Sequence, residues 1–329
     1  MEMLDFFLVA TSTIGFIRVC KALIKFLKWV WVMFLRPPKD LKEYGSWAMI
    51  TGSTDGIGKA MALEFASKGL NLVLVGRNPL KLEATSKEIR DHGHRVEVKC
   101  VVMDMEKVGG VEMVKRIEEA IEGLDIGLLV NGAGLAYPYS RFFHEVDLQL
   151  MDAIVRVNVE GPTWITKAVL PTMIKKKKGA IINIGSGSTV VLPSYPLVAL
   201  YAASKGYLQM FSRCISLEYK NQGIDIQCQV PLFVSTKMTK MKSSLFVPTP
   251  ETYGKSCTSC IGYEKLVVPY FFHSLQAFVI KLIPETFMDS YMLRHFLYFR
   301  GRGLSRDSRI KALAASNSEA KITNEDGAN

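Results

Sequence analysis

Short runs of hydrophobic residues alternate with longer amphipathic stretches over much of the chain. Strands are predicted at residues 47–51, 71–75, 96–102, 128–130, 180–184 and 224–230, where hydrophobic residues predominate, and helices at residues 57–68, 80–91 and 108–122. Strands that are hydrophobic throughout are typical of a parallel sheet covered by helices on both faces. The pattern therefore predicts an α/β fold with a doubly wound parallel sheet, in which ligands bind at the carboxyl ends of the strands.

The N-terminal segment has a different pattern. Residues 6–17 are mainly apolar, and four basic residues then fall on one stripe of a helix: Arg18, Lys21, Lys25 and Lys28. We interpret this segment as a spanning anchor or as a basic amphipathic helix in the membrane interface; a helix packed on the folded domain is the third interpretation. The uncharged stretch is shorter than the roughly 20 residues that a spanning helix needs. Because Pro37 and Pro38 end the helix, residues 1–45 are expected to form a membrane anchor and linker.

The C-terminal third is also distinct from the alternating region. Residues 236–253 are polar and rich in Ser, Thr, Lys and Pro, which suits a mobile lid. Residues 266–283 and 287–299 are strongly apolar but interrupted by Pro269 and Pro284, so we expect them to dip into a membrane, line a hydrophobic channel or pack as terminal helices. The domain division expected is therefore 46–235, then a lid and apolar extension at 236–311, and a disordered tail at 312–329.

Composition and charge narrow the class of protein. Of the 329 residues, 49% are hydrophobic and 22% are charged, which excludes a disordered chain. The formal net charge of +10 comes from residues 1–38, 175–178 and 294–311, so the rest of the chain is close to neutral. Basic segments beside apolar ones favour an anionic membrane surface, with an anionic ligand as a second partner. No nucleic-acid-binding signal is present. The six scattered cysteines, including Cys257-x-x-Cys260, are expected to be free thiols without a metal site.

A glycine-rich turn joins the first predicted strand to the first helix. It reads Thr51-Gly52-Ser53-Thr54-Asp55-Gly56-Ile57-Gly58, and the whole loop from Gly52 to Gly58 is expected to bind a dinucleotide. Its glycines let the backbone approach a pyrophosphate, which then lies at the positive end of the helix. The second strand ends at Arg77 with no acidic residue for a ribose hydroxyl, which favours NADPH/NADP⁺, with its 2′-phosphate, over NAD.

The spacing T-G-x-x-x-G-x-G resembles that of the short-chain dehydrogenase/reductase family, and the resemblance extends from about residue 46 to 234. It implies a Rossmann-type fold and a role for each matching residue. Asp104 would hold the adenine, Asn131 begins the N-G-A-G segment, Asn158 would bind a relay water, and Val234 and Thr236 would meet the nicotinamide. Pro231-Leu232 departs from the Pro-Gly common in the family. By family spacing Ser188, rather than Ser186, would hold the substrate carbonyl, and Tyr201-x-x-x-Lys205 completes the set.

The chemistry of this set explains its spacing. Tyr201 and Lys205 are four residues apart in a predicted helix, so both side chains project from one face. An ammonium near the phenol, together with the positive charge of the oxidised cofactor, is expected to lower the pKa of Tyr201 toward neutrality. Tyr201 would then donate a proton to a carbonyl oxygen as hydride arrives, while Ser188 stabilises the developing alkoxide.

Two further stretches, at residues 136–146 and 227–238, resemble the membrane-bound very-long-chain 3-oxoacyl-CoA reductases, whose relatives include microsomal 17-beta-hydroxysteroid dehydrogenases. The resemblance implies NADPH-dependent reduction of a long-chain acyl-CoA substrate in fatty acid elongation. It also implies an endoplasmic reticulum membrane with the catalytic domain facing the cytosol, contact with membrane lipid and other elongase enzymes, and a homodimer. The alternatives are a hydroxysteroid or other lipid carbonyl reductase and a non-catalytic elongase scaffold.

Overall fold

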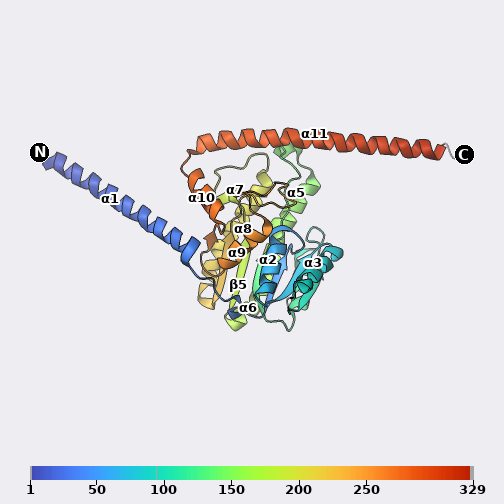
Figure 1. The fold of residues 1–329 in the computed structure, drawn as a ribbon, viewed down its shortest axis with the longest axis horizontal. Helices are drawn as coiled ribbons and strands as arrows, with labels where there is room; N and C mark the ends of the chain where they lie inside the picture. Colours follow the sequence, from blue (N-terminus) through green and yellow to red (C-terminus); the bar gives the residue numbers. More distant parts are fainter. Residues whose placement is uncertain (1, 94, 327–329) are drawn as a thin grey trace. The chain divides into compact units, whose positions relative to one another are not determined.

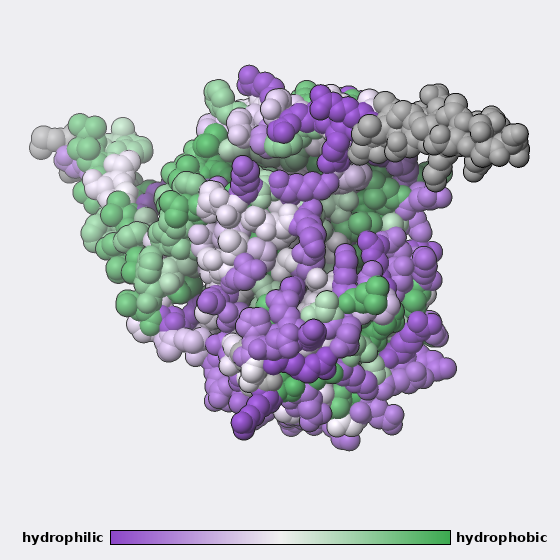
Figure 2. All heavy atoms as spheres, turned by 45° about the vertical axis from the view of Figure 1, so that its right-hand side comes forward, coloured by the Kyte–Doolittle hydropathy of each residue, from purple (hydrophilic) through white to green (hydrophobic). Residues whose placement is uncertain are grey.

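The structure is a computed structural model and describes residues 2–93 and 95–326. It divides into two compact units, Met1–Lys39 and Asp40–Asn329. In the first unit, helix α1 (Glu2–Val30) continues into a π-helical turn, η1 (Trp31–Leu35). Its apolar side chains are largely exposed, and Figure 2 shows them in green along this helix. Residues Met3–Leu35 are long and apolar enough to cross a membrane, so the helix is a candidate anchor.

The second unit is built on a parallel sheet of seven strands in the order β3-β2-β1-β4-β5-β6-β7. The strands are β1 (Trp47–Thr51), β2 (Asn71–Gly76), β3 (Val98–Val102), β4 (Ile126–Asn131), β5 (Gly179–Ile184), β6 (Ile224–Gln229) and β7 (Leu266–Val267). Every pair of neighbouring strands is parallel. The predicted doubly wound fold is confirmed, and the two-residue strand β7 was not predicted.

Helices cover both faces of the sheet (Figure 1). They are α2 (Gly56–Ser67), α3 (Pro79–Asp91), α4 (Gly110–Ile121), α5 (Leu148–Val155), α6 (Gly161–Lys176), α7 (Gly187–Val190), α8 (Ala199–Glu218), α9 (Pro250–Ser259), α10 (Phe271–Ile280) and α11 (Glu285–Asp326). Alternate residues of β1 enter opposite cores: Ile50 packs with Phe65 of α2, and Met49 packs with Ile165 of α6. Both faces of the strand are therefore apolar, as the sequence pattern indicates.

Helix α11 lies over the loops at one end of this domain and is red in Figure 1. Met288, Met292 and Phe296 pack into an apolar cluster with Tyr137 and Ile154. Ser194 donates a hydrogen bond to Asp289 at 2.5 Å, and Arg300 pairs with Glu145. The helix continues to Asp326 and so includes most of the segment for which composition predicts disorder, whereas residues 327–329 lie outside the described residues.

The two glycines of α11 allow a matched test of how this helix packs. A Cβ atom at Gly303 would lie 2.3 Å from Cγ of Tyr139, whereas one at Gly301 would have nothing within 4 Å. Gly303→Ala is expected to lower the free energy of unfolding by roughly 1–3 kcal/mol, because overpacking forces α11 away from its loop. Gly301→Ala should instead stabilise the helix by about 1 kcal/mol. Denaturant unfolding of both variants measures this, and equal effects would show that α11 does not pack on Tyr139.

Candidate active site

The loop between β1 and α2 is shaped by its glycines. Gly52 has φ +68°, and a Cβ atom there would lie 2.8 Å from the backbone of Ala133. A Cβ atom at Gly58 would lie 2.4 Å from the carbonyl oxygen of Gly52. Asp55 caps α2 by accepting a hydrogen bond from the Gly56 amide at 2.8 Å, and its carboxylate also lies 2.8 Å from Nζ of Lys237. Only glycine fits at positions 52 and 58, so the loop keeps its backbone open to a ligand.

A cleft of about 560 Å³ lies along this loop and the carboxyl ends of the strands. Twelve of the residues expected to bind the cofactor line it: Gly52, Thr54, Asp55, Gly56, Ile57, Gly58, Arg77, Asp104, Tyr201, Lys205, Val234 and Thr236. The loop glycines, the basic residue after β2 and the buried lysine together fit a dinucleotide. Lys81, in the first turn of α3, also lines the cleft and was not predicted.

Two residues expected to bind the cofactor lie behind the wall of the cleft. Ser53 is fully buried, and its hydroxyl donates to the carbonyl of Val75 at 3.3 Å. The side-chain amide of Asn131 donates to Thr166 at 3.1 Å and to Asn183 at 2.7 Å, which ties β4 to α6 and β5. Both side chains donate hydrogen bonds to buried groups of neighbouring strands and helices. The structure therefore does not bring them to the cleft.

Arg77 lies at the exposed end of the cleft. Its guanidinium is 2.6 Å from Oε1 of Glu106, while Oδ1 of Asp104 accepts a hydrogen bond from the Glu106 amide at 3.2 Å. Because this ion pair is exposed, it contributes little energy and leaves the guanidinium available to a stronger anion.

Tyr201 and Lys205 project from one face of α8, as predicted. The Lys205 Nζ lies 5.9 Å from the centre of the Tyr201 ring and donates a hydrogen bond to the carbonyl of Ile184 at 2.8 Å. Burial lowers the pKa of Lys205 to about 8. Burial also raises the pKa of Tyr201 above its usual value, and a hydrogen bond with Ser186 acts in the opposite direction. Desolvation thus penalises the phenolate, and the lowering of the Tyr201 pKa by the ammonium together with the oxidised cofactor stays a prediction.

The two serines after β5 form a chain of hydroxyls that ends at the tyrosine. Ser186 caps α7, and the Ser188 hydroxyl donates to the Ser186 hydroxyl at 2.9 Å. Ser186 in turn is hydrogen-bonded to Tyr201. The sequence interpretation favoured Ser188, but in the structure Ser186 contacts the phenol and Ser188 is joined to it through Ser186. The preference of short polar residues for helix N-caps was the available signal for Ser186.

Asn158 lies in a π-helical turn, η4 (Arg156–Glu160), between α5 and α6. Its side chain is buried; Oδ1 accepts from the amide of Leu135 at 2.7 Å, and Nδ2 donates to the Leu135 carbonyl and to Ser204, both at 2.9 Å. A Cβ atom at Gly134 would lie 3.5 Å from Lys205 Nζ and 3.7 Å from Asn158 Oδ1. The lysine and the asparagine therefore approach each other across a glycine, while the relay water stays a prediction.

His273 supports the turn in which Pro231-Leu232 departs from the family pattern. Its Nδ1 accepts from the amide of Leu232 at 3.3 Å, and its Nε2 donates to the carbonyl of Phe233 at 3.0 Å. Burial lowers the pKa of His273 to about 4, so the ring is neutral at physiological pH. His273 is completely buried, so its ring packs inside the domain.

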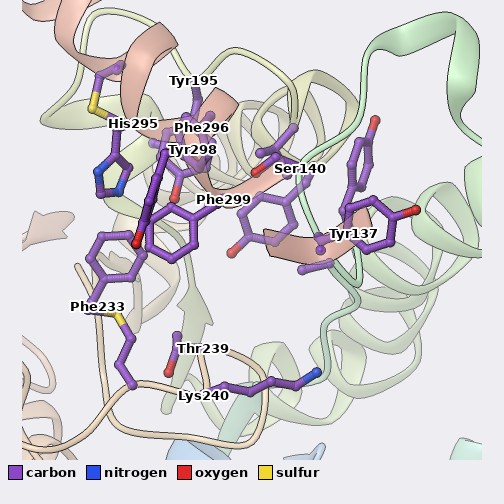
Figure 3. Close-up of a pocket in the computed structure, with 18 of the residues that line it drawn as sticks. Tyr137, Ser140, Tyr195, Phe233, Thr239, Lys240, His295, Phe296, Tyr298 and Phe299 are labelled. Carbon is purple, nitrogen blue, oxygen red and sulfur yellow. The ribbon is translucent and has the colours of Figure 1, made fainter. Parts of the chain in front are cut away.

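A second, larger cavity of about 1420 Å³ opens beside the tyrosine. Ser186, Ser188 and Tyr201 line it, together with residues of the loop after β4, residues 231–242 and α11. Figure 3 shows Tyr298 and Phe299 of α11 on one side and Thr239 and Lys240 on the other. Tyr201 and Ser186 belong to the walls of both cavities, so a phenol and a hydroxyl stand where they meet. Tyr137 lies in the stretch 136–146 singled out by resemblance, and Phe296 lies in 287–299, for which a hydrophobic channel was one interpretation; neither was predicted as an individual residue.

This geometry defines a dinucleotide-dependent oxidoreductase, in which a tyrosine–lysine pair lies between a cofactor cleft and a substrate cavity. The family model described as short chain dehydrogenase matches residues 46–244, and the chain belongs to this family.

Curated relatives refine the comparison. A very-long-chain 3-oxoacyl-CoA reductase-like protein of Arabidopsis thaliana is 46% identical over 89% of this chain and 94% of its own length. The human very-long-chain 3-oxoacyl-CoA reductase is 37% identical over 73% of this chain and 76% of its own. The human inactive hydroxysteroid dehydrogenase-like protein 1 is 39% identical over 74% of each. A solved structure described for 7beta-hydroxysteroid dehydrogenase stereoselectivity has a TM-score of 0.69 at 25% identity and covers 77% of this chain and 99% of its own.

Proposed function

We propose that the protein is an NADPH-dependent reductase that converts a very-long-chain 3-oxoacyl-CoA to the 3-hydroxyacyl-CoA. The observation that carries this proposal is the position of Tyr201, shared by the cofactor cleft and by a cavity of about 1420 Å³ with many apolar side chains. A carbonyl placed in that cavity can reach the phenol and face a nicotinamide in the cleft at the same time.

The chain's own residues supply the proton and the positioning. A bound nicotinamide would supply the hydride that the carbonyl carbon accepts. Tyr201 has a raised pKa, so it stays protonated at neutral pH and can donate its proton to the carbonyl oxygen. Ser188 and Ser186 would donate hydrogen bonds to the developing alkoxide. Lys205 would hold the nicotinamide ribose, and with Asn158 it would return a proton to Tyr201 from solvent.

The substrate class and the location follow from other features. The human relative is by its name a very-long-chain 3-oxoacyl-CoA reductase, and the Arabidopsis relative is named as a protein like it. The apolar walls of the cavity suit a fatty acyl chain. The apolar helix Met3–Leu35 would attach the protein to the endoplasmic reticulum membrane, with the catalytic domain facing the cytosol. There it would meet long-chain substrate, membrane lipid and other elongase enzymes, and it would act as a homodimer.

A specific observation favours the alternatives of a steroid reductase and a non-catalytic scaffold. One relative is named as an inactive hydroxysteroid dehydrogenase-like protein, and the similar solved structure concerns a hydroxysteroid dehydrogenase. The presence of Ser188, Tyr201, Lys205 and Asn158 in one buried site argues against a scaffold.

The cofactor preference is tested at Arg77. Arg77→Glu is expected to raise KM for NADPH at least about tenfold and to leave KM for NADH little changed, because a carboxylate repels the 2′-phosphate that a guanidinium would bind. Initial rates with each cofactor measure this. Arg90→Glu, an exposed change on α3 outside the cleft, is the control. An unchanged KM for NADPH in Arg77→Glu would exclude a phosphate contact at this residue.

The substrate is tested by assaying membranes that carry the wild-type chain with NADPH and either a long-chain 3-oxoacyl-CoA or a 17-ketosteroid. We expect rapid NADPH oxidation with the acyl-CoA and little with the steroid. The reverse order would replace the proposed substrate by a steroid, and no oxidation with either would favour the scaffold.

A further inference from the structure

The larger cavity has a strongly asymmetric charge. Among the described residues that line it, five are basic and none is acidic; the basic ones are Lys240, Lys242, Arg302, Arg306 and Arg309. All five are exposed, and in the described part of the chain none of them forms an ion pair with a carboxylate. Five positive charges without carboxylate partners repel one another. An anion bound at this wall relieves that repulsion, so the wall favours an anionic ligand.

The three arginines continue an apolar stripe of α11. Fourteen residues of α11 line the cavity. Seven of them recur at intervals of three or four residues and so form one stripe along the helix: Met288, Met292, His295, Phe299, Arg302, Arg306 and Arg309. The wall thus changes from apolar to cationic along the helix axis. At 1.5 Å per residue, the arginine part extends over about 10 Å.

The cationic part of α11 is held against the domain at two neighbouring points. Nε of Arg300 donates to Oε2 of Glu145 at 3.1 Å, and its guanidinium lies 5.2 Å from the centre of the Phe142 ring. Gly303 packs directly on the ring of Tyr139. The Arg302 guanidinium also lies 5.8 Å from the centre of the Tyr298 ring, which faces the cavity. Contacts on both sides of Arg302 therefore fix the helix at the start of the arginine stripe.

From these observations we infer that Arg302, Arg306 and Arg309, with Lys240 and Lys242, bind the phosphate groups of the coenzyme A part of the substrate, while the apolar part of the wall binds the acyl chain. The inference rests on the proposed function and deepens it. A guanidinium fork matches phosphate oxygens in pairs. Of the substrates considered, only the CoA thioester carries phosphates, so this wall would distinguish an acyl-CoA from a steroid.

The test compares two substrates that differ only in their phosphates. One is a long-chain 3-oxoacyl-CoA, and the other carries the same acyl group on N-acetylcysteamine, which keeps the thioester and lacks phosphates. The variant is Arg302→Gln with Arg306→Gln, because these residues line the larger cavity and not the cofactor cleft. The control is Lys281→Gln with Arg294→Gln, which removes two exposed charges that line neither cavity.

In the arginine variant we expect kcat/KM for the CoA thioester to fall by about tenfold or more, since each lost contact is a charge-assisted one. We expect no change in kcat/KM for the N-acetylcysteamine thioester or in KM for NADPH. In the control variant, kcat/KM for both thioesters should match that of the wild type. Isothermal titration with free CoA should show a weaker Kd in the arginine variant alone. Equal losses on both thioesters, or no loss on either, would overturn the phosphate assignment.

Three other outcomes distinguish a failure of the phosphate site from a failure of the proposed function. If the arginine variant loses affinity for phosphatidylserine vesicles while its Kd for CoA is unchanged, the arginines bind lipid headgroups and the inference is wrong. If the wild-type chain reduces neither thioester, the proposed function itself is wrong. If it reduces both thioesters but the arginine variant behaves as the control does, only the phosphate site is excluded.

Discussion

Replacing Tyr201 by Phe is expected to lower kcat for carbonyl reduction by about 10²–10⁴-fold, the usual contribution of a positioned proton donor. The aromatic ring stays, so the packing around α8 should be kept, and the Kd for NADPH should change little. The loss arises because the Tyr201 phenol lines both cavities and has the Lys205 ammonium 5.9 Å from its ring centre. Steady-state rates with a 3-oxoacyl-CoA and fluorescence titration with NADPH measure the two quantities.

Tyr207→Phe is the matched control for this change. Tyr207 lies on the same helix, its hydroxyl is 2.8 Å from that of Thr163, and it lines neither cavity. Its loss should leave kcat unchanged. Similar rates in Tyr201→Phe and Tyr207→Phe would remove Tyr201 from the mechanism.

Replacing Lys205 by Met is expected to abolish measurable turnover without lowering thermal stability. The ammonium is buried and donates to the Ile184 carbonyl, a position from which it can hold the nicotinamide ribose. Its pKa falls from 10.5 to about 8 in the folded chain, which corresponds to a cost of roughly 3 kcal/mol for burying the charge at neutral pH. Met removes that cost with little change in volume. Turnover and Tm at pH 7 measure both effects, and a much lower Tm would contradict the burial argument.

The same lysine gives a signature in the pH dependence of stability. Between about pH 8 and 10.5 the unfolded chain keeps the Lys205 proton while the folded chain releases it. The free energy of unfolding contributed by this group therefore rises with pH across that window. In Lys205→Met the rise should be absent, whereas in Lys87→Met, an exposed change on α3, it should remain. Urea unfolding at several pH values distinguishes the two.

Several parts of the fold and site could be predicted because their signals are local. Residues 72–75 are hydrophobic throughout, as a strand buried on both faces requires, and they form most of β2. The glycine loop was predictable because positions 52 and 58 admit no side chain. Tyr201 and Lys205 were predictable because a helix brings residues four apart together.

Other parts depend on contacts that no local pattern encodes. Ser53 and Asn131 match the family motif, yet their side chains turn inward to satisfy buried groups. Strand β7 has only two residues and forms because β6 offers it an edge. The large cavity is assembled from segments far apart in the chain, so a channel wall was only one of three interpretations of residues 287–299, and the side chains that form the wall were not predicted.

The central claim is that Tyr201 protonates a carbonyl that receives hydride from a nicotinamide cofactor. Its most direct test uses NADPH with deuterium in the transferable position of the nicotinamide, a long-chain 3-oxoacyl-CoA, and mass spectrometry of the product. We predict that the wild-type chain forms 3-hydroxyacyl-CoA with one deuterium on the hydroxyl-bearing carbon, and that Tyr201→Phe forms almost none. Unlabelled product, or equal labelled product from both chains, would contradict the account.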